Sequence, residues 1–214
     1  MKKAIYTVVI ALLLVLIFGT LYVFRKEAAV TPEIHGVVLD NPKPLVTFAL
    51  KDMNGKSFTD QSFLGHWSLV FFGFTSCPDI CPTTLSLLNQ VMDLVYAKPG
   101  VPMPQVIFVS VDPERDTPEK LKQYVTHFNP NFLGVTGNHD QLTDFSRQLG
   151  VVYEKVSLDK NSPDYTIDHG GSIALINRRG AIQAYFTPPL DAQHIADDYA
   201  ATLGYASPCL PPAN

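Results

Sequence analysis

Cysteine is scarce in this chain of 214 residues: there are three, too few for a framework of disulfide bonds, so each cysteine needs its own explanation. Charge is modest as well, with a formal net charge of −4 and no basic tract. Because basic and aromatic residues are not interleaved, nucleic acid is excluded as a partner. Internal repeats and low-complexity tracts are also missing, apart from a Pro-rich tail. The sequence therefore indicates one globular domain with short additions at its ends.

An uncharged apolar segment covers residues 4–24, with Lys2 and Lys3 before it and Arg25 and Lys26 after it. As a helix it would span roughly 30 Å, the thickness of the hydrocarbon core of a bilayer. A cleaved signal peptide is the alternative, but its apolar part normally runs about 7–15 residues and ends at a small-residue cleavage site. This segment is longer and has no such site, so the sequence predicts an uncleaved single-pass membrane anchor.

The flanks of this segment bear on the location of the protein. Two lysines and the α-amino group crowd its first side, which favours an amino terminus in the cytoplasm and the rest of the chain outside. No Arg- and Ser-rich transit sequence precedes it, which favours a bacterial origin. We therefore expect an anchor in the bacterial inner membrane and a soluble domain in the periplasm.

The remaining sequence, about 190 residues, is long enough for a hydrophobic core without disulfide staples. Strands are expected near residues 46–50, 57–59, 69–74, 106–111, 132–135, 151–156, 172–176 and 181–186, and helices near 82–97, 140–149 and 191–203 and from residue 117 onward. This alternation predicts a thioredoxin-like α/β fold, in which helices cover both faces of a central mixed sheet. The expected divisions are an anchor at 1–25, a linker at 26–44, the thioredoxin-like domain at 45–205 and the tail at 206–214.

Two cysteines, Cys77 and Cys81, follow the apolar run 69–74 and so lie where a buried strand is expected to pass into a helix. They can close a disulfide, or they can hold a soft metal ion together with a third ligand. A structural disulfide would enclose only about five residues and would change the entropy of the chain little. A helix amino terminus lowers the pKa of a thiol and supplies thiolate, which is both the nucleophile and the metal ligand. A reactive or ligating pair is therefore favoured over a structural one.

His169 is the candidate third ligand, because it lies in the region where thioredoxin-like folds bring a loop close to the helix that carries the cysteines. Redox members of the fold usually place a cis-proline there, and no proline occurs between Asp164 and Tyr185. Two thiolates and one imidazole suit copper, whereas zinc would want a fourth ligand or a water. Asp168 either orients the imidazole or is a plain turn carboxylate. Asp79 either caps the helix or adjusts the charge near the ion.

Three motifs resemble, in order, those of the Sco/SenC family: FGFTSCPDICP at 72–82, VSVDPERDTP at 109–118 and DH at 168–169. The similarity extends over about residues 46–203, nearly the whole soluble domain. In this family the histidine is usually followed by serine, whereas here Gly170 and Gly171 come first and leave the loop freer to move. Cys209, in the tail, matches no feature of the family.

The resemblance implies a membrane-anchored copper metallochaperone rather than an enzyme. Members of this family help deliver copper to the dinuclear centre of cytochrome c oxidase subunit two, and some reduce the cysteines of that centre. By position, the resemblance implies that Cys77, Cys81 and His169 are the ligands of Cu(I) and also of Cu(II). It also implies that residues 112–118 support the fold near the site. The implied partners are subunit two and a periplasmic thiol reductant.

Two enzymatic alternatives stay open. In a thiol–disulfide oxidoreductase, Cys77 and Cys81 would be catalytic, one attacking and the other resolving the mixed disulfide. A thiol peroxidase of related fold needs only one attacking cysteine, so it leaves the second cysteine and His169 without a role.

Overall fold

The computed structural model describes residue 6 and residues 12–19, 34–159 and 164–205. The chain divides into two units, Met1–Glu33 and Ile34–Asn214. In the first unit residues 12–19 are helical, and no helix in the described part of the chain has both the length and the apolar character needed to cross a membrane. Most of the predicted anchor, the linker up to residue 33 and the tail with Cys209 lie outside the described residues.

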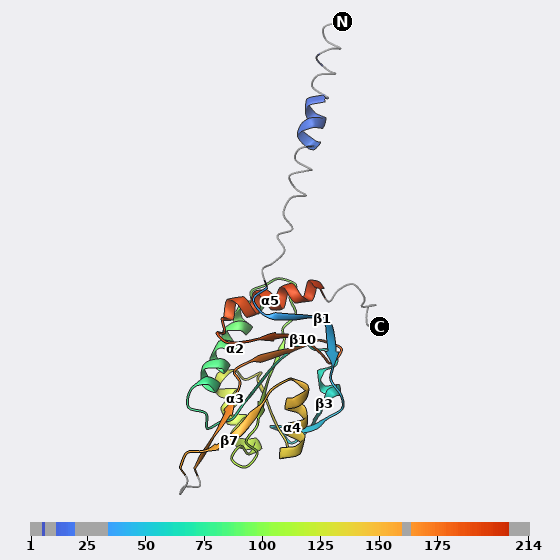
Figure 1. The fold of residues 1–214 in the computed structure, drawn as a ribbon. Helices are drawn as coiled ribbons and strands as arrows, with labels where there is room; N and C mark the ends of the chain where they lie inside the picture. Colours follow the sequence, from blue (N-terminus) through green and yellow to red (C-terminus); the bar gives the residue numbers. More distant parts are fainter. Residues whose placement is uncertain (1–5, 7–11, 20–33, 160–163, 206–214) are drawn as a thin grey trace. The chain divides into compact units, whose positions relative to one another are not determined.

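The second unit is built on an eight-stranded sheet in the order β1-β10-β9-β4-β5-β6-β2-β3 (Figure 1). In this sheet β5 lies parallel to both of its neighbours, β4 and β6, and the other pairs are antiparallel. Two further strands, β7 and β8, form a separate antiparallel ribbon. The strands are β1 (Val37–Pro44), β2 (Ala49–Asp52), β3 (Ser57–Thr59), β4 (Ser68–Gly73), β5 (Gln105–Ser110), β6 (Leu133–Thr136), β7 (Tyr153–Ser157), β8 (Tyr165–His169), β9 (Ile173–Ile176) and β10 (Ala181–Phe186).

Strand β4 shows why a continuous apolar run was to be expected at the centre of the sheet. All of its residues are buried, and successive side chains point to opposite faces. Leu69 and Phe71 belong to the core on one face, and Val70 and Phe72 belong to the core on the other. A strand covered on both faces has no polar side to alternate with its apolar one.

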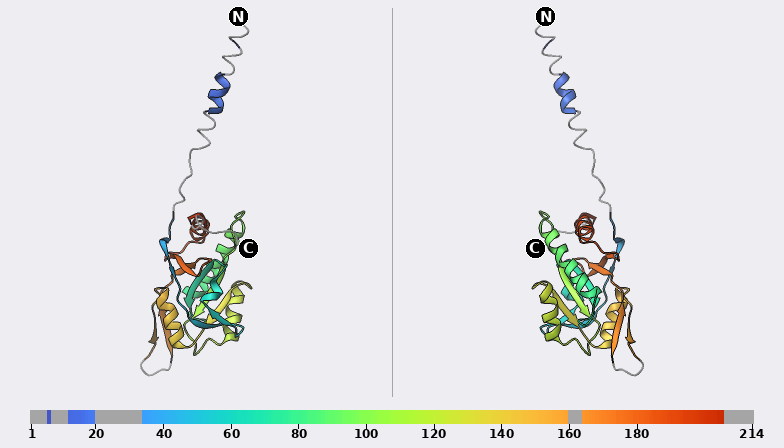
Figure 2. Two further views of the ribbon diagram at one scale, coloured as in Figure 1. Left: turned by 90° about the vertical axis from the view of Figure 1, so that its right-hand side faces the viewer. Right: turned by 90° about the vertical axis from the view of Figure 1, so that its left-hand side faces the viewer.

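Helices cover both faces of the sheet, as the sequence predicted. On one face lie α2 (Ile80–Tyr96), α3 (Pro118–Phe128) and α5 (Ala192–Tyr205), which share one hydrophobic core. On the other face lie α4 (His139–Gln148) and the short 3-10 helix η1 (Asp60–Phe63). Figure 2 shows α4 and α2 on opposite sides of the sheet.

The start of α3 agrees with its sequence signals. The Thr117 side chain accepts a hydrogen bond from the backbone N–H of Lys120, and Pro118 occupies the first helical turn. At α4, Asn138 and Gln141 form a reciprocal capping box. These caps fix where each helix begins relative to the strand before it.

Strand β1 corrects the predicted linker, because residues 37–44 pair with β10 instead of connecting two parts of the chain. Val37 lies opposite Tyr185, and Pro44 lies opposite Ala181. The segment is mostly exposed and contains Pro42 and Pro44, so it carries no alternating apolar pattern. An edge strand tolerates proline because one of its sides needs no ladder hydrogen bonds.

The β7–β8 ribbon is the second difference from the prediction. A strand was expected at 151–156, and β7 begins at Tyr153 instead. Strand β8 was not predicted at all, and it places His169 at the end of a strand rather than in a loop. Strand β7 is largely exposed, and β8 has a single buried residue, Ile167, so neither shows the apolar pattern of a buried strand.

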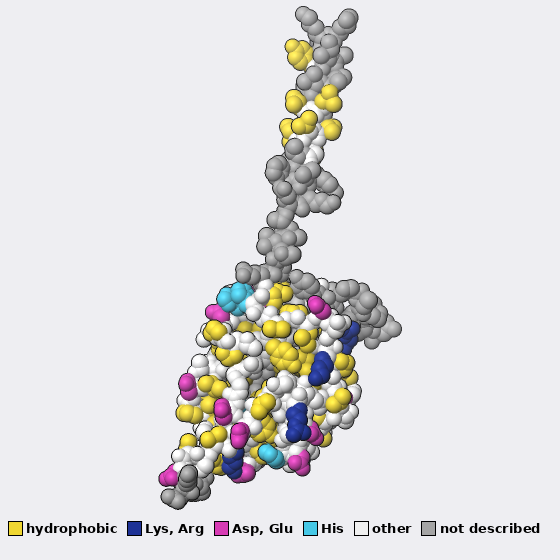
Figure 3. Space-filling view, in the orientation of Figure 1, with side chains coloured by type: hydrophobic (Ala, Val, Ile, Leu, Met, Phe, Trp, Pro, Cys, Tyr) yellow, Lys and Arg dark blue, Asp and Glu magenta, His cyan; other side chains and the backbone are white. Residues whose placement is uncertain are grey.

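The surface carries no basic patch on the face drawn in Figure 3, where acidic and basic side chains are scattered among polar ones. Hydrophobic side chains gather on this face over β10. The apolar surface on this face needs an explanation.

Candidate metal centre

The two sulfur atoms of Cys77 and Cys81 and a ring nitrogen of His169 all lie within 4.8 Å of one another. The Sγ of Cys81 is 3.4 Å from the Nε2 of His169, although 88 positions separate the two residues in the sequence. Among the described residues this is the only cluster of three or more His, Cys, Asp or Glu side chains close enough to share one metal ion. The three residues that the sequence indicated are thus brought together by the fold.

The two cysteines are positioned by the turn from β4 into α2. The backbone N–H of Cys77 donates to the carbonyl of Phe74, and Cys81 lies in the first turn of the helix. Asp79 is the residue before the helix, but its side chain makes no capping hydrogen bond. Cys77 is half-buried and Cys81 is fully buried, and both are free thiols. The pair therefore presents one accessible sulfur and one enclosed sulfur.

Gly73, the last residue of β4, makes room for the enclosed sulfur. A Cβ atom at this position would lie 2.6 Å from the Sγ of Cys81 and 2.7 Å from the ring of Phe108. Both distances are below any normal contact, so no side chain fits there. Glycine is required here by the close approach of the helix to the strand.

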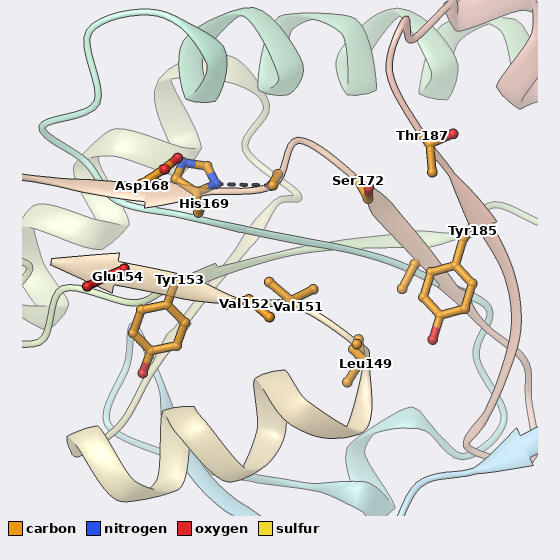
Figure 4. Close-up of a pocket in the computed structure, with 13 residues that line it drawn as sticks. Leu149, Val151, Val152, Tyr153, Glu154, Asp168, His169, Ser172, Tyr185 and Thr187 are labelled. Atoms are coloured by element: carbon orange, nitrogen blue, oxygen red, sulfur yellow. Dashed lines mark hydrogen bonds between the residues drawn. The ribbon is translucent and has the colours of Figure 1, made fainter. Parts of the chain in front are cut away.

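The imidazole of His169 is held by two aromatic rings and one carbonyl group. Phe71 and Phe74 meet it edge-on, with ring centroids 6.1 Å and 5.9 Å away. Its Nδ1 lies 3.1 Å from the carbonyl oxygen of Gly170 (Figure 4). When the Nδ1–H donates to this carbonyl, the lone pair of the neutral ring is on Nε2, the nitrogen that faces Cys81. This is the tautomer that a metal ligand needs.

Asp168 does not orient the imidazole. Its side chain is exposed and forms no hydrogen bond or ion pair with any described residue, and the carbonyl of Gly170 occupies the place expected for it. Sequence adjacency suggested a hydrogen bond that these two side chains do not make.

Burial shifts the pKa of two of the three candidate ligands. It raises the pKa of the Cys81 thiol, and the nearby Cys77 acts in the same direction. Burial also lowers the pKa of His169, and this effect is opposed only in part by the Gly170 carbonyl and Asp168. The sequence predicted a thiol pKa lowered by the helix terminus; for Cys81 this is wrong, because desolvation outweighs the helix dipole. A metal ion must therefore displace a proton from Cys81 when it binds.

A second layer of residues holds the loop after β5 against the site. The buried Asp116 accepts hydrogen bonds from the backbone N–H of Thr75 at 2.8 Å and from the hydroxyl of Ser110 at 2.6 Å. It also accepts one from the hydroxyl of Thr75, and it lies 3.4 Å from the Nζ of Lys120. One carboxylate thus joins the loop that carries Cys77 to β5 and α3.

Asp112 forms a second link, to the ribbon that carries His169. It accepts hydrogen bonds from the hydroxyl of Tyr165 at 2.8 Å and from the guanidinium of Arg115. The sequence assigned this run a supporting role near the site, which agrees with these contacts. The partner Tyr165 was missed because β8 carries no pattern that predicts a strand.

The fold and the cluster of two cysteines and one histidine define a thioredoxin-like protein with a candidate site for a soft metal ion. A family model described as SCO1/SenC matches residues 40–204, and the chain belongs to this family. An SCO2-like protein of Rickettsia typhi is 35% identical over 200 residues, which cover 92% of this chain and 98% of the relative. A protein of Stutzerimonas stutzeri named as a putative copper-binding protein is 33% identical over 162 residues, or 76% of this chain and 78% of the relative.

Solved structures of related proteins contain copper. ScoI of Arabidopsis thaliana with copper bound matches with a TM-score of 0.69 and 31% identity, over 74% of this chain and 97% of that chain. ScoI of Bradyrhizobium japonicum with copper bound matches with a TM-score of 0.63 and 35% identity, over 73% of this chain and 97% of that one. The likeness covers the domain that carries the cluster of Cys77, Cys81 and His169.

Proposed function

We propose that the protein is a copper metallochaperone, which binds one copper ion through Cys77, Cys81 and His169 and delivers it to the dinuclear centre of cytochrome c oxidase subunit two. The observation that carries this proposal is the convergence of two sulfur atoms and one imidazole nitrogen within 4.8 Å. Two soft thiolates and one imidazole suit Cu(I) in a three-coordinate site and accept Cu(II) with a further ligand. The copper-bound structures of relatives support the choice of metal.

Release of the ion follows from the unequal burial of its ligands. Cys77 and His169 are half-buried, whereas Cys81 is enclosed. An acceptor thiolate can therefore reach the ion from the side of Cys77 and replace one donor at a time. Cys81 is the last ligand to be exchanged, which keeps the ion bound to protein throughout the transfer.

The location of this activity is part of the proposal. The apolar segment at 4–24 anchors the chain in the bacterial inner membrane, and the second unit lies in the periplasm beside the oxidase. Because the sulfur atoms of a disulfide cannot serve as thiolate ligands, an oxidising compartment requires a periplasmic reductant that keeps Cys77 and Cys81 as thiols.

A thiol–disulfide oxidoreductase is the second candidate, favoured by two free thiols within 4.8 Å of each other. In this reaction the thiolate of Cys77, the more exposed sulfur, attacks a substrate disulfide and releases one substrate thiolate. Cys81 then loses its proton and attacks the mixed disulfide, which gives a Cys77–Cys81 disulfide and the second substrate thiol. This role has no use for His169.

The test is copper binding by the full-length protein in a mild detergent, with both cysteines reduced. We expect one copper per chain, and we expect His169→Ala to weaken binding by at least about a hundredfold, since even partners of metal ligands contribute 10–100-fold. His66→Ala, which removes an exposed histidine outside the cluster, is the matched control and should bind as the wild type does. Equal binding by both variants would remove His169 from the site. Absence of copper binding together with rapid disulfide reduction would favour the oxidoreductase.

A further inference from the structure

A groove of about 790 Å³ lies next to the candidate metal centre. Figure 4 shows His169 at one end of it and Tyr185 at the other. Its walls come from the segment between α4 and β7, from the turn between β8 and β9, and from β10. Apart from His169, none of the proposed copper ligands lines this groove.

The groove is apolar along the segment that enters β7. Leu149, Val151 and Val152 line it, and Val152 leaves 82% of its surface exposed. Burial of an apolar side chain is favourable, so a partner that covers Val152 gains free energy. Exposed apolar surface that is continuous with a groove marks an interaction site in many proteins. Figure 3 shows hydrophobic side chains gathered over β10, which forms the other wall.

Tyr185 adds a polar group to the apolar wall. It is half-buried in the groove, and its hydroxyl makes no hydrogen bond within the described residues. Burial raises the pKa of Tyr185, so the hydroxyl stays neutral and can both donate and accept a hydrogen bond. A tyrosine with an apolar ring and a free hydroxyl is typical of protein interfaces.

Two carboxylates face each other at the end of the groove near the metal centre. Glu154 on β7 and Asp168 on β8 are directly opposite partners in the ribbon, and both line the groove. Like charges directly opposite each other on paired strands are destabilising. Neither carboxylate forms an ion pair or hydrogen bond with another described residue, and the adjacent Lys155 is paired with Glu114 at 2.8 Å. A cation from outside the chain would therefore neutralise the repulsion between these two carboxylates.

We propose that this groove docks the copper acceptor, through an apolar loop of that protein that carries a lysine or arginine side chain. The apolar loop covers Val152 and Tyr185, and its cation lies between Glu154 and Asp168. This inference rests on the proposed function, because the occupant is the protein that takes copper from the centre beside His169. Docking here places the thiolates of the acceptor beside Cys77, where ligand exchange begins.

The experiment measures the Kd between the full-length, copper-loaded chain and the copper-free soluble domain of cytochrome c oxidase subunit two. Val152→Asp puts a charge into the apolar wall, and Glu154→Lys reverses one charge of the acidic pair. We expect each to raise the Kd at least about tenfold, the equivalent of 1.4 kcal/mol. We also expect the wild-type Kd to rise with salt concentration and that of Glu154→Lys to respond less, because the ion pair is lost.

Two matched controls test whether the effect belongs to the groove. Tyr96→Asp places a charge on another apolar residue that is 82% exposed, and Asp144→Lys reverses an exposed carboxylate on α4. Neither residue lines the groove, so both variants should keep the wild-type Kd within about twofold. Copper stoichiometry and affinity, measured on every variant, should stay at the wild-type values for Val152→Asp and Glu154→Lys.

Several outcomes would overturn the proposal. Unchanged Kd values for Val152→Asp and Glu154→Lys, with copper binding intact, would show that subunit two docks elsewhere and would leave the proposed function standing. Wild-type chain that loads copper and yet forms no complex would exclude this partner. Sedimentation that reveals self-association abolished by Val152→Asp would identify a second copy as the occupant. Failure of the wild type to bind copper at all would instead count against the metallochaperone itself.

Discussion

The hydroxyl of Tyr165 donates a hydrogen bond of 2.8 Å to the buried carboxylate of Asp112, which fastens the strand that ends at His169 to the loop after β5. Arg115 strengthens this link, because it donates to the backbone carbonyl of Tyr165 at 3.0 Å and stacks on its ring at 3.7 Å. The loop that supports the cysteines and the ribbon that carries the histidine are thereby held as one unit.

Replacement of Tyr165 by phenylalanine should loosen this unit without removing the stacked ring. Asp112 then loses one donor while it stays buried, so we expect the free energy of unfolding to fall by about 1–3 kcal/mol. Copper affinity should fall by up to about tenfold, because part of this free energy fixes His169 in place. Urea unfolding and a competition titration with a copper chelator measure the two effects. Tyr96→Phe changes an exposed tyrosine and should alter neither, and a Tyr165→Phe variant as stable as the wild type would show that the bond contributes nothing.

Removal of the Asp116 carboxylate should be more damaging, because several donors converge on it. In Asp116→Ala the hydroxyl of Ser110 and the N–H and hydroxyl of Thr75 lose their acceptor in a buried place. We expect the free energy of unfolding to fall by about 3–5 kcal/mol, the range for a broken buried network. Glu119→Ala, an exposed acid three residues further on, should cost less than about 0.5 kcal/mol. Similar losses in the two variants, measured by urea unfolding, would contradict this account.

The sequence predicted the central strands and the grouping of the candidate ligands because both depend on strong signals in the sequence. A continuous apolar run such as 69–74 is typical of a strand covered on both faces, and Thr117 followed by Pro118 marks a helix start. The cluster of Cys77, Cys81 and His169 was predicted from residue type and motif order, and the fold brings these residues together.

What the sequence missed depends on contacts that only the fold creates. Strand β1 is held by pairing with the distant β10 and β8 by pairing with β7, and neither has an apolar pattern of its own. Cys81 is enclosed because α2 packs against β4. The position of Cys81 at the start of a helix therefore could not predict that its pKa is raised. The groove near Val152 joins three segments far apart in sequence, and no local pattern marks it.

Gly73→Ala should disturb the metal centre, because the added Cβ would meet the Sγ of Cys81 at 2.6 Å. Forcing an extra methyl group into a packed core costs about 1–3 kcal/mol, and here the group that must shift is a candidate copper ligand. We therefore expect lower stability and at least about tenfold weaker copper binding. Gly204→Ala, on α5, is the matched control, since a Cβ there has no neighbour within 4 Å. Copper binding by Gly73→Ala at the level of Gly204→Ala would show that the sulfur has more freedom than its packing indicates.

Stability of the reduced, copper-free protein should fall with rising pH because of Cys81. Its pKa in the folded chain is raised above the ordinary value of 9.0, so near this pH the unfolded chain loses a proton that the folded chain keeps. The unfolded state then binds fewer protons, and the free energy of unfolding decreases by at most about 1.4 kcal/mol per pH unit. Near pH 10, the ordinary pKa of tyrosine, the buried Tyr199 begins to add an effect of the same sign. The effect of Cys81 is therefore measured below this pH.

The check is urea unfolding of wild type and Cys81→Ala at several pH values between about 8 and 10, with reductant and chelator present. We expect a flatter pH dependence for Cys81→Ala, because the alanine has no proton to lose in the unfolded state. Val91→Ala, a truncation at another buried position of α2, should lower stability by a similar amount at every pH and keep the wild-type slope. Equal slopes for Cys81→Ala and wild type would mean that the folded thiol ionises as readily as the unfolded one. Burial would then not hold the proton on Cys81, and copper would enter a site whose enclosed sulfur is already a thiolate.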